Sequence, residues 1–138
     1  MSVKTGIANS DSERAYLQTR YRHISETMFQ HKFDAGEYML ISHDDAPLGW
    51  LRWGYFWDSI PFMNMLYIEA SQRQKGYGRQ LVTAWEDHMR AANYSTIMTS
   101  TLANEPTQHF YRKLGYTDRG ALLLPAEPLE IIFYKVID

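Results

Sequence analysis

The sequence predicts one domain with an α/β fold (mixed α+β), in which a mostly antiparallel central sheet is flanked by helices. Two apolar segments, residues 37–42 and 48–57, are separated by a short polar turn, which is the pattern of a hairpin. Residues 79–92 carry apolar side chains at helical spacing. No internal repeat, low-complexity tract or linker divides the 138 residues, so we expect a single domain over residues 1–138.

The N-terminal third is the part with the weakest pattern. Residues 3–8 are the only candidate for a strand ahead of the first hairpin. Residues 10–30 are polar and compatible with one helix or two short ones. We expect Tyr16, Ile24 and Met28 on the buried side of this helical region, with Leu17 and Tyr21 as further candidates.

The second half alternates strands and helices, as a mixed sheet requires. A break at residues 59–61 ends the hairpin. The elements expected after it are a strand at 62–68, a helix at 79–92, a strand at 95–102, a helix between 104 and 115, a short strand near 117 and a final strand at 129–137.

Residues 73–78, Arg-Gln-Lys-Gly-Tyr-Gly, connect the third strand to the helix at 79–92. Gly76 and Gly78 allow the backbone to turn sharply and to come close to a ligand. A turn that opens a helix leaves N–H groups without acceptors in the helix, and the helix dipole is positive there. Together they predict a site for a pyrophosphate group. Three cations flank the turn: Arg73, Lys75 and Arg79.

Other glycine motifs do not fit this segment. A P-loop needs Gly-Lys-Ser/Thr, which the chain lacks, and a dinucleotide fingerprint needs a third glycine where Leu81 stands. The remaining alternative is a glycine-rich turn between a strand and a helix that binds no ligand.

A short helix with defined ends is predicted between Asn104 and Gly115. Asn104 is expected to cap its N-terminus, and Gly115 stands where a left-handed residue often ends a helix. Phe110 and Leu114 are four residues apart and are expected to form the buried face. Tyr111 therefore points along a different side of this helix.

These two motifs together resemble the GNAT superfamily of acetyl-CoA-dependent N-acetyltransferases. That family carries Arg/Gln-x-x-Gly-x-Gly/Ala after its fourth strand and Asn-x-x-Ala-x-x-Phe-Tyr-x-Lys-Leu-Gly-Phe/Tyr on a later helix. Here the first motif is residues 73–78, and the second runs from Asn104 through residues 110–116. The resemblance covers about residues 37–137 and implies the GNAT fold, with acetyl-CoA as acetyl donor. The chain departs from the family at Ala70, where Pro is common.

The resemblance also implies which residues hold the cofactor and which one serves as acid. In the family, a Tyr on the helix of the second motif commonly protonates the leaving thiolate, and Tyr111 matches it. An acid within hydrogen-bond reach of the sulfur lowers the cost of its departure. The alternative is that Tyr111 is an aromatic wedge that stabilises the fold. The implied cofactor-binding residues are Leu66, Ile68, Arg73, Gln74, Gly76, Tyr77, Gly78, Arg79, Asn104 and Tyr111.

The group that removes the amine proton is left open by the sequence. Glu69 directly follows the strand at 62–68, and the resemblance implies a place beside the pantetheine arm. Some relatives have a Glu earlier on that strand, where this chain has Phe62, and others have one on the next strand, near Thr99 here. A water chain assisted by Glu69 or His109 is the second interpretation. A solvated carboxylate with no role in catalysis is the third.

An aromatic cluster in the second strand has two interpretations. Side-chain alternation places Trp53, Tyr55 and Trp57 on one face. They form either the floor of an acceptor pocket that holds an apolar or cationic amine by cation–π contact, or part of a strand buried on both faces. Arg52 is a candidate partner for an acidic group of the substrate. The cluster consists of Trp50, Trp53, Tyr55, Phe56 and Trp57.

Composition narrows the class of protein. A net charge of -2 with 22% charged residues argues against nucleic-acid binding. No apolar run is long enough to span a bilayer, and the first residues lack the apolar core of a signal peptide. The chain has no Cys, and its five His lack metal-ligand spacing, so we expect no disulfide and no metal site. We expect a cytoplasmic protein.

The resulting prediction is an N-acetyltransferase that moves the acetyl group of acetyl-CoA to a primary amine of a small molecule, by direct attack in a ternary complex. One alternative is an acetyltransferase for protein N-termini or lysines, and another is a non-catalytic sensor domain that binds acyl-CoA. The expected partner is a small-molecule or peptide amine, with no nucleic acid and no membrane; a homodimer is left open. The sequence does not identify the acceptor, because the acceptor site is built from the third of the chain that least resembles the family.

Overall fold

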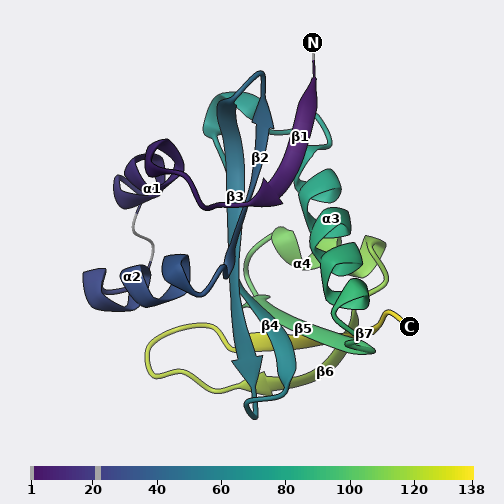
Figure 1. Cartoon of the computed structure of the whole chain (residues 1–138). Coiled ribbons are helices and arrows are strands. Elements are labelled where there is room, and N and C mark those ends of the chain that lie inside the picture. The colour runs from purple at the N-terminus through teal and green to yellow at the C-terminus, as the bar shows by residue number, and fades with distance from the viewer. Residues whose placement is uncertain (1, 21–22) are drawn as a thin grey trace. The chain divides into compact units, whose positions relative to one another are not determined.

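The structure is a computed structural model that describes residues 2–20 and 23–138. Over these residues, seven strands are hydrogen-bonded in the order β1-β2-β3-β4-β5-β7-β6, accompanied by four α-helices and one 3-10 turn (Figure 1). The strands are β1 (Val3–Ile7), β2 (Tyr38–His43), β3 (Ala46–Phe56), β4 (Ile60–Ile68), β5 (Thr96–Leu102), β6 (Thr117–Leu122) and β7 (Glu130–Val136). The helices are α1 (Asp11–Gln18), α2 (Glu26–Asp34), α3 (Tyr77–Ala91), α4 (Thr107–Lys113) and the 3-10 turn η1 (Ala70–Gln72).

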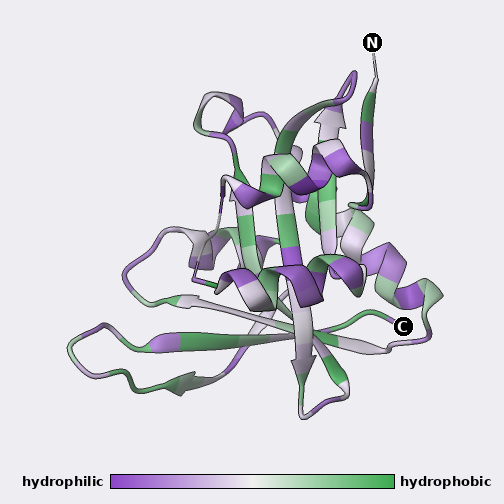
Figure 2. Cartoon of the chain, turned by 60° about the vertical axis from the view of Figure 1, so that its left-hand side comes forward, coloured by the Kyte–Doolittle hydropathy of each residue, from purple (hydrophilic) through white to green (hydrophobic). Residues whose placement is uncertain are grey.

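The strand directions confirm the predicted fold class. β1 pairs with β2, β2 with β3, β5 with β7 and β6 with β7, all antiparallel. β4 and β5 are parallel. In Figure 2 the helices show hydrophilic and hydrophobic segments in turn, whereas the strands carry more of the hydrophobic colour, as expected when helices cover a sheet. The result is a mixed α/β fold with a mostly antiparallel sheet.

The chain divides into two compact units, each of which is described by itself. The first consists of Met1–Trp53 with Met65–Trp85, and the second of Gly54–Asn64 with Glu86–Asp138. β3, β4 and α3 each contribute residues to both units.

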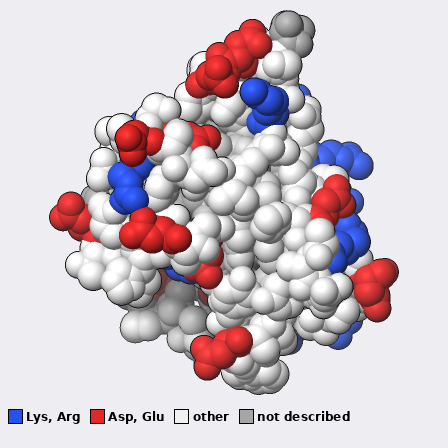
Figure 3. Space-filling view, viewed as in Figure 1, with Lys and Arg blue, Asp and Glu red and all other residues white. Residues whose placement is uncertain are grey.

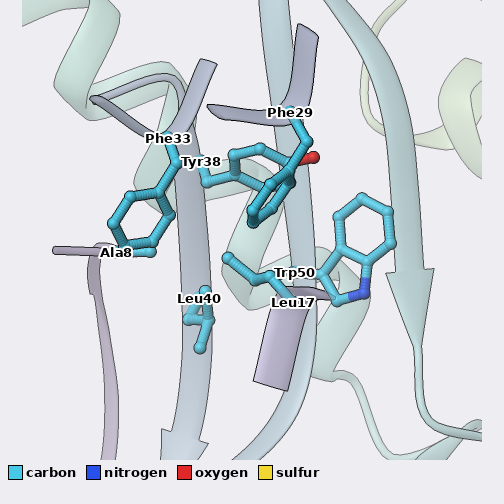
Figure 4. Close-up of a cluster of buried hydrophobic side chains, with 7 residues drawn as sticks. All are labelled: Ala8, Leu17, Phe29, Phe33, Tyr38, Leu40 and Trp50. Carbon is cyan, nitrogen blue, oxygen red and sulfur yellow. The ribbon is translucent and has the colours of Figure 1, made fainter. Parts of the chain in front are cut away.

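In the first unit, two short helices pack their aromatic side chains against β2 and β3. Phe29 and Phe33 of α2 lie side by side, and the edge of Phe29 meets Tyr38, with ring centroids 5.5 Å apart (Figure 4). Leu17 is 1% exposed, as expected, whereas Met28 is 49% exposed, so the expectation that Met28 is buried was wrong. Tyr21 lies outside the described residues. The region holds two helices with separate caps, and Phe29 and Phe33 form the buried face of the second. The cluster comprises Ala8, Leu17, Phe29, Phe33, Tyr38, Leu40 and Trp50.

The helix start signals in this region are side-chain caps. Ser10 accepts a hydrogen bond from the Glu13 N–H at 3.1 Å, and the Glu13 carboxylate accepts one from the Ser10 N–H at 3.0 Å. This reciprocal capping box starts α1. At α2 the cap is one-way: the Ser25 hydroxyl accepts a hydrogen bond from the Met28 N–H at 3.1 Å. The weak strand candidate at residues 3–8 is a strand, β1, which pairs with β2 at the edge of the sheet.

In the second unit, β5 lies between β4 and β7. It pairs with β7 along its whole length, whereas its parallel pairing with β4 covers only Phe62–Met98 and Met63–Thr99. A buried polar network joins α3 to this sheet: the Glu86 carboxylate accepts hydrogen bonds from the Tyr116 hydroxyl at 2.8 Å and from Lys135 Nζ at 3.0 Å. Because Glu86 is 5% exposed, these two donors offset the cost of burying its charge.

Candidate active site

The predicted phosphate turn joins β4 to α3 in the first unit. After β4 ends at Ile68, η1 and a bend bring the chain to Tyr77, the first residue of α3. Gln74 and Gly76 have φ angles of 62° and 85°, so the bend uses left-handed backbone. The Gln80 N–H donates to the Gly76 carbonyl at 3.1 Å, which begins the helical hydrogen bonds. The three N–H groups before it, at residues 77–79, therefore point beyond the helix end.

The predicted cofactor residues of the first unit form one continuous segment. Leu66 and Ile68 are half-buried at the end of β4, and Tyr77 and Gly78 are half-buried at the start of α3. The remaining members, Arg73, Gln74, Gly76 and Arg79, are exposed around the bend.

Arg73 lies back against the strand that precedes it. Its Nε donates to the Ile68 carbonyl at 2.8 Å, and its guanidinium carbon is 5.5 Å from the centre of the Tyr67 ring. The bond to the backbone involves Nε, and the guanidinium carries four further N–H groups on its two terminal nitrogens. The side chain is thus oriented beside the turn that it is predicted to serve.

Glu69, the candidate base, is held by two side chains of the α1 region. Its Oε2 accepts hydrogen bonds from the Tyr16 hydroxyl and from Arg20 Nε, the latter at 2.5 Å. Burial and the bond to Glu69 raise the pKa of Tyr16, so its hydroxyl stays protonated and continues to donate. Both contacts stabilise the charged carboxylate, which favours an anchoring role over proton transfer. Sequence reasoning did not find Tyr16 or Arg20 as partners, because both lie about 50 residues away along the chain.

In the second unit, Asn104 and Tyr111 lie on either side of the start of α4. Asn104 is exposed in the turn before the helix, and α4 begins at Thr107 with Pro106 at the cap position and no side-chain cap. The prediction that Asn104 caps this helix was wrong. Instead, the Gln108 side chain donates to backbone carbonyls of that turn, at 2.8 and 2.9 Å. Gly115 follows the helix with a φ of 94°, as predicted.

Tyr111 is the most buried residue of α4. Its side chain is 4% exposed, and its ring centroid is 5.6 Å from that of Tyr116 and 5.8 Å from that of Phe133. The buried face was predicted at Phe110 and Leu114, which are only half-buried, so that prediction was wrong. The reason is that β7 and the residue after Gly115 supply aromatic partners that helix spacing alone does not reveal.

The surroundings of the Tyr111 hydroxyl keep it protonated. Burial, the largest cause, raises the pKa of Tyr111 to about 12, while a hydrogen bond with the Thr99 side chain opposes that rise. The Thr99 hydroxyl also donates to the Met63 carbonyl at 2.9 Å, which ties it to β4. Tyr111 therefore holds its proton at neutral pH beside a fixed hydroxyl.

A carboxylate that the sequence did not single out lies on the other face of β5. The Ser100 hydroxyl donates to Glu130 Oε2 at 2.6 Å. The charges of Glu105 and Glu130 also contribute to the raised pKa of Tyr111. A pairing of β5 with a strand 30 residues later produces this contact, and no local motif marks it. His109, the other candidate to assist, is exposed on α4.

The aromatic cluster does not form one face. Trp53 is 2% exposed in the first unit, where its ring centroid is 6.2 Å from that of Trp85. In the second unit, Tyr55 is half-exposed beside Tyr94, and Trp57 is 78% exposed with a φ of 55°. The predicted alternation fails because β3 ends at Phe56 and Trp57 lies in the turn to β4. Arg52 is buried, and burial lowers its pKa.

Charges are mixed on the face shown in Figure 3, where acidic and basic side chains lie close to one another. In the first unit, Arg14 and Asp34 form an ion pair at 2.7 Å. Among the helices of the described ranges, none combines the length and apolar character needed to cross a membrane.

Comparisons with known proteins agree with this fold. The model of the Acetyltransferase (GNAT) family matches residues 7–116. No curated protein matches the sequence. An acetyltransferase of the GNAT family from Bacillus cereus has a TM-score of 0.80 at 20% identity, covering 99% of this chain and 98% of that one.

Two further solved structures contain bound ligands. Arabidopsis thaliana Naa50, in complex with the bisubstrate analogue CoA-Ac-MVNAL, has a TM-score of 0.75 at 18% identity, with 98% of this chain and 99% of that one covered. A chain of the NatC complex bound to Gag peptide and CoA has a TM-score of 0.83 at 12% identity, with both chains fully covered. At these identities the likeness shows a shared fold.

Proposed function

The chain belongs to the acetyltransferase (GNAT) family and is an acetyl-CoA-dependent acetyltransferase, and we propose that it acetylates the primary amine of a small molecule by direct attack within a ternary complex. The observation that carries the proposal is the turn at residues 73–78, which opens the 15-residue helix α3 with backbone donors and exposed cations. A pyrophosphate bound there would lie at the positive end of the helix dipole.

Backbone and side-chain groups of the turn make different contacts with CoA in this proposal. Backbone N–H groups at residues 77–79 donate to phosphate oxygens, and Arg73 and Arg79 add charge-assisted hydrogen bonds. Gly76 has open space around its Cα, so a phosphate group can approach the backbone there without meeting a side chain. Leu66 and Ile68, half-buried at the end of β4 in the same unit, are the proposed contacts of the pantetheine arm.

Tyr111 is the residue that we propose as the general acid. The amine nitrogen attacks the thioester carbonyl, and the carbon–sulfur bond breaks as the acetyl group moves to nitrogen. The thiolate that leaves then takes the proton of the Tyr111 hydroxyl. A hydroxyl that remains protonated at neutral pH is suited to this step.

A peptide amine is the second candidate acceptor. It is favoured by the likeness to two structures that were solved with peptide-like ligands. Trp57 and Tyr55, which are exposed in the second unit, are candidates for contact with either acceptor. Aromatic side chains hold ammonium groups or apolar bodies equally well, so they do not choose between the two.

The experiment that tests the function is an acceptor screen by release of free thiol from acetyl-CoA. The panel contains polyamines, amino acids, drug-like amines and short peptides with free N-termini or lysines. We expect turnover with at least one small amine, at a kcat/KM above that of every peptide. A higher kcat/KM for peptides would select the second candidate. Thiol release from no acceptor, together with tight CoA binding, would replace both with a non-catalytic acyl-CoA-binding domain.

We also propose that residues 1–138 act as one acetyltransferase domain. Three elements, β3, β4 and α3, continue from one compact unit into the other, so neither unit has a complete set of its own strands and helices. A single unfolding transition seen equally by near-UV and far-UV circular dichroism is the expected behaviour.

A further inference from the structure

Glu130 lies at the first position of β7 and is held by a side chain of the neighbouring strand. The Ser100 hydroxyl donates to its carboxylate at 2.6 Å, and both groups are partly buried. In the sheet register, Glu130 faces Leu102 of β5 on one side and Leu122 of β6 on the other. Its nearest register neighbours are therefore apolar, and Ser100 is the polar group that orients it.

Side-chain alternation places Glu130 and Tyr111 on opposite faces of the sheet. Thr99 points toward α4, because its hydroxyl interacts with Tyr111 and because its register partner Phe133 packs on the Tyr111 ring. Ser100 is the next residue of β5, so its side chain points to the other face. Glu130 follows Ser100 to that face. Figure 1 shows α4 beside β5.

Ser100, which holds Glu130, lies on β5 just where the pairing of β5 with β4 ends. Phe62–Met98 and Met63–Thr99 are the two pairs between these strands within the second unit. Ser100 is the first residue of β5 beyond them. The Tyr111 hydroxyl interacts with Thr99, and Glu130 is bonded to Ser100, so the two groups reach adjacent positions of one strand from its two faces.

Direct acetyl transfer needs a proton acceptor for the amine and a proton donor for the thiolate, both within reach of the thioester, and the Glu130 charge is near enough to Tyr111 to act on its pKa. The amine must lose a proton as its nitrogen bonds to the carbonyl carbon, and the sulfur must gain one as it leaves. An arrangement with a carboxylate on one face and a protonated phenol on the other meets both needs without a second role for either group.

We propose that Glu130, oriented by Ser100, is the general base that takes the proton from the attacking amine; this rests on the function proposed above. The nitrogen–carbon bond forms, Glu130 receives the N–H proton, the carbon–sulfur bond breaks, and Tyr111 gives its proton to the thiolate. The products are the acetamide and free CoA. The proton on Glu130 is then returned through water to the Tyr111 oxygen, so the enzyme is restored with no other reactant.

The other carboxylates near these groups are less suited to this step. Glu69 is engaged by Tyr16 and Arg20 in the first unit. Glu105 is exposed in the turn before α4. Its charge contributes to the raised pKa of Tyr111. Glu130, by contrast, has a side-chain partner on β5, the Ser100 hydroxyl, which fixes the orientation of its carboxylate.

The test compares three variants with the full-length enzyme and the best amine of the acceptor screen. Glu130→Gln keeps the size and the hydrogen bond from Ser100 but cannot accept a proton, so kcat should fall by about 10²-fold. Glu127→Gln changes an exposed carboxylate of the same β6–β7 connection and should have no effect. Ser100→Ala leaves the carboxylate but frees its orientation, and a loss between those two is expected.

Two further readouts separate catalysis from folding. CoA affinity by calorimetry and the melting temperature should be unchanged in Glu130→Gln, and the rise of kcat with pH on the acid side should be lost. Glu105 and Glu130 both act electrostatically on Tyr111. The dependence of kcat on pH in Glu130→Gln is therefore compared with that in Tyr111→Phe, which should keep the rise of kcat on the acid side. If Glu130→Gln fails to fold, Glu130→Asp serves instead, with a loss in kcat and a retained pH profile.

The outcomes are distinct. Glu130→Gln with kcat within twofold of the wild type, or no lower than Glu127→Gln, would overturn the base assignment and leave the acetyltransferase function standing. A wild-type protein that binds CoA but acetylates no amine would overturn both proposals.

Discussion

Tyr111 combines two roles that the sequence offers as alternatives. Its ring packs between Tyr116 and Phe133, and its hydroxyl stays protonated beside Thr99. Packing positions the ring, and burial keeps the proton on the oxygen. A buried aromatic wedge and a general acid are therefore compatible descriptions of one residue.

Replacing Tyr111 by Phe separates these roles. The ring remains, so the melting temperature and CoA affinity should stay near those of the wild type. Loss of the acid should lower turnover by about 10²-fold when chemistry limits the rate. Pre-steady-state thiol release measures that step, and a variant with wild-type turnover would leave Tyr111 with packing alone.

The tryptophans of the aromatic cluster should respond differently to truncation. Trp53 is buried against Trp85, so Trp53→Ala should cost about 3–5 kcal/mol of unfolding free energy. Trp57 is exposed, so Trp57→Ala should leave stability nearly unchanged and raise the acceptor KM if this side chain contacts the acceptor. Urea unfolding beside acceptor kinetics distinguishes these effects. An unchanged KM in a stable Trp57→Ala protein would remove Trp57 from the acceptor site.

At the scale of elements, the β4–turn–α3 segment is the clearest case in which local chemistry predicts local structure. The two glycines, the cations and the apolar strand before them all lie within 20 residues, and the structure has the expected strand, bend and helix. At Gly49 the structure excludes any side chain, a constraint that no sequence pattern predicts. A Cβ there would be 2.5 Å from the Tyr67 carbonyl, so only glycine lets β3 come this close to the end of β4.

Gly78→Val tests the use of this segment for cofactor binding. A branched side chain in the first turn of α3 would obstruct a phosphate that approaches the backbone, whereas Val is no worse a helix former than the Gly it replaces. The dissociation constant for CoA should rise by tenfold or more while the protein stays folded. Calorimetry with CoA measures this, and Glu127→Gln is the control. An unchanged CoA affinity in folded Gly78→Val would mean that phosphate is bound elsewhere.

How far prediction reaches at this scale depends on the distance between partners along the chain. Gly115 was predicted to end α4 because its signal is local, and it does so with left-handed backbone. Asn104 carries an equally good local signal, yet α4 starts at Thr107, and the N–H groups of Gln108 and His109 donate instead to the Glu105 and Pro106 carbonyls, at 3.4 and 3.0 Å. The Ser100–Glu130 and Glu69–Arg20 contacts are 30 and 49 residues apart in sequence, and sheet register and helix packing create them.

For the whole molecule, buried tyrosines link stability to alkaline pH. Burial is the first cause of the raised pKa of both Tyr111 and Tyr116, and for Tyr116 the neighbouring Glu86 charge adds to it. In the unfolded chain both phenols would ionise near pH 10. Their contribution to stability is therefore fully present below about pH 10 and is lost as the pH rises through the folded values.

The expected result is a steep loss of unfolding free energy between pH 10 and 12. Each phenol that is protonated only in the folded state contributes a slope of about 1.4 kcal/mol per pH unit. Tyr111→Phe should reduce the slope by that amount, and lysines, which titrate in the same range, cancel in the comparison. Urea unfolding at several pH values measures it. Equal slopes for the two proteins would contradict the buried, protonated state of Tyr111.

The bond from Arg73 to the Ile68 carbonyl has a consequence for the thermodynamics of cofactor binding. A free arginine gives up much of its rotamer entropy when it grips a phosphate. Arg73 has already given up part of that freedom before CoA arrives, so less is lost on binding. Lysine has the same charge but not the forked donors that allow one nitrogen to hold the backbone while the others face the ligand. Arg73→Lys would therefore bind CoA with a less favourable entropy, at an unchanged net charge of the protein.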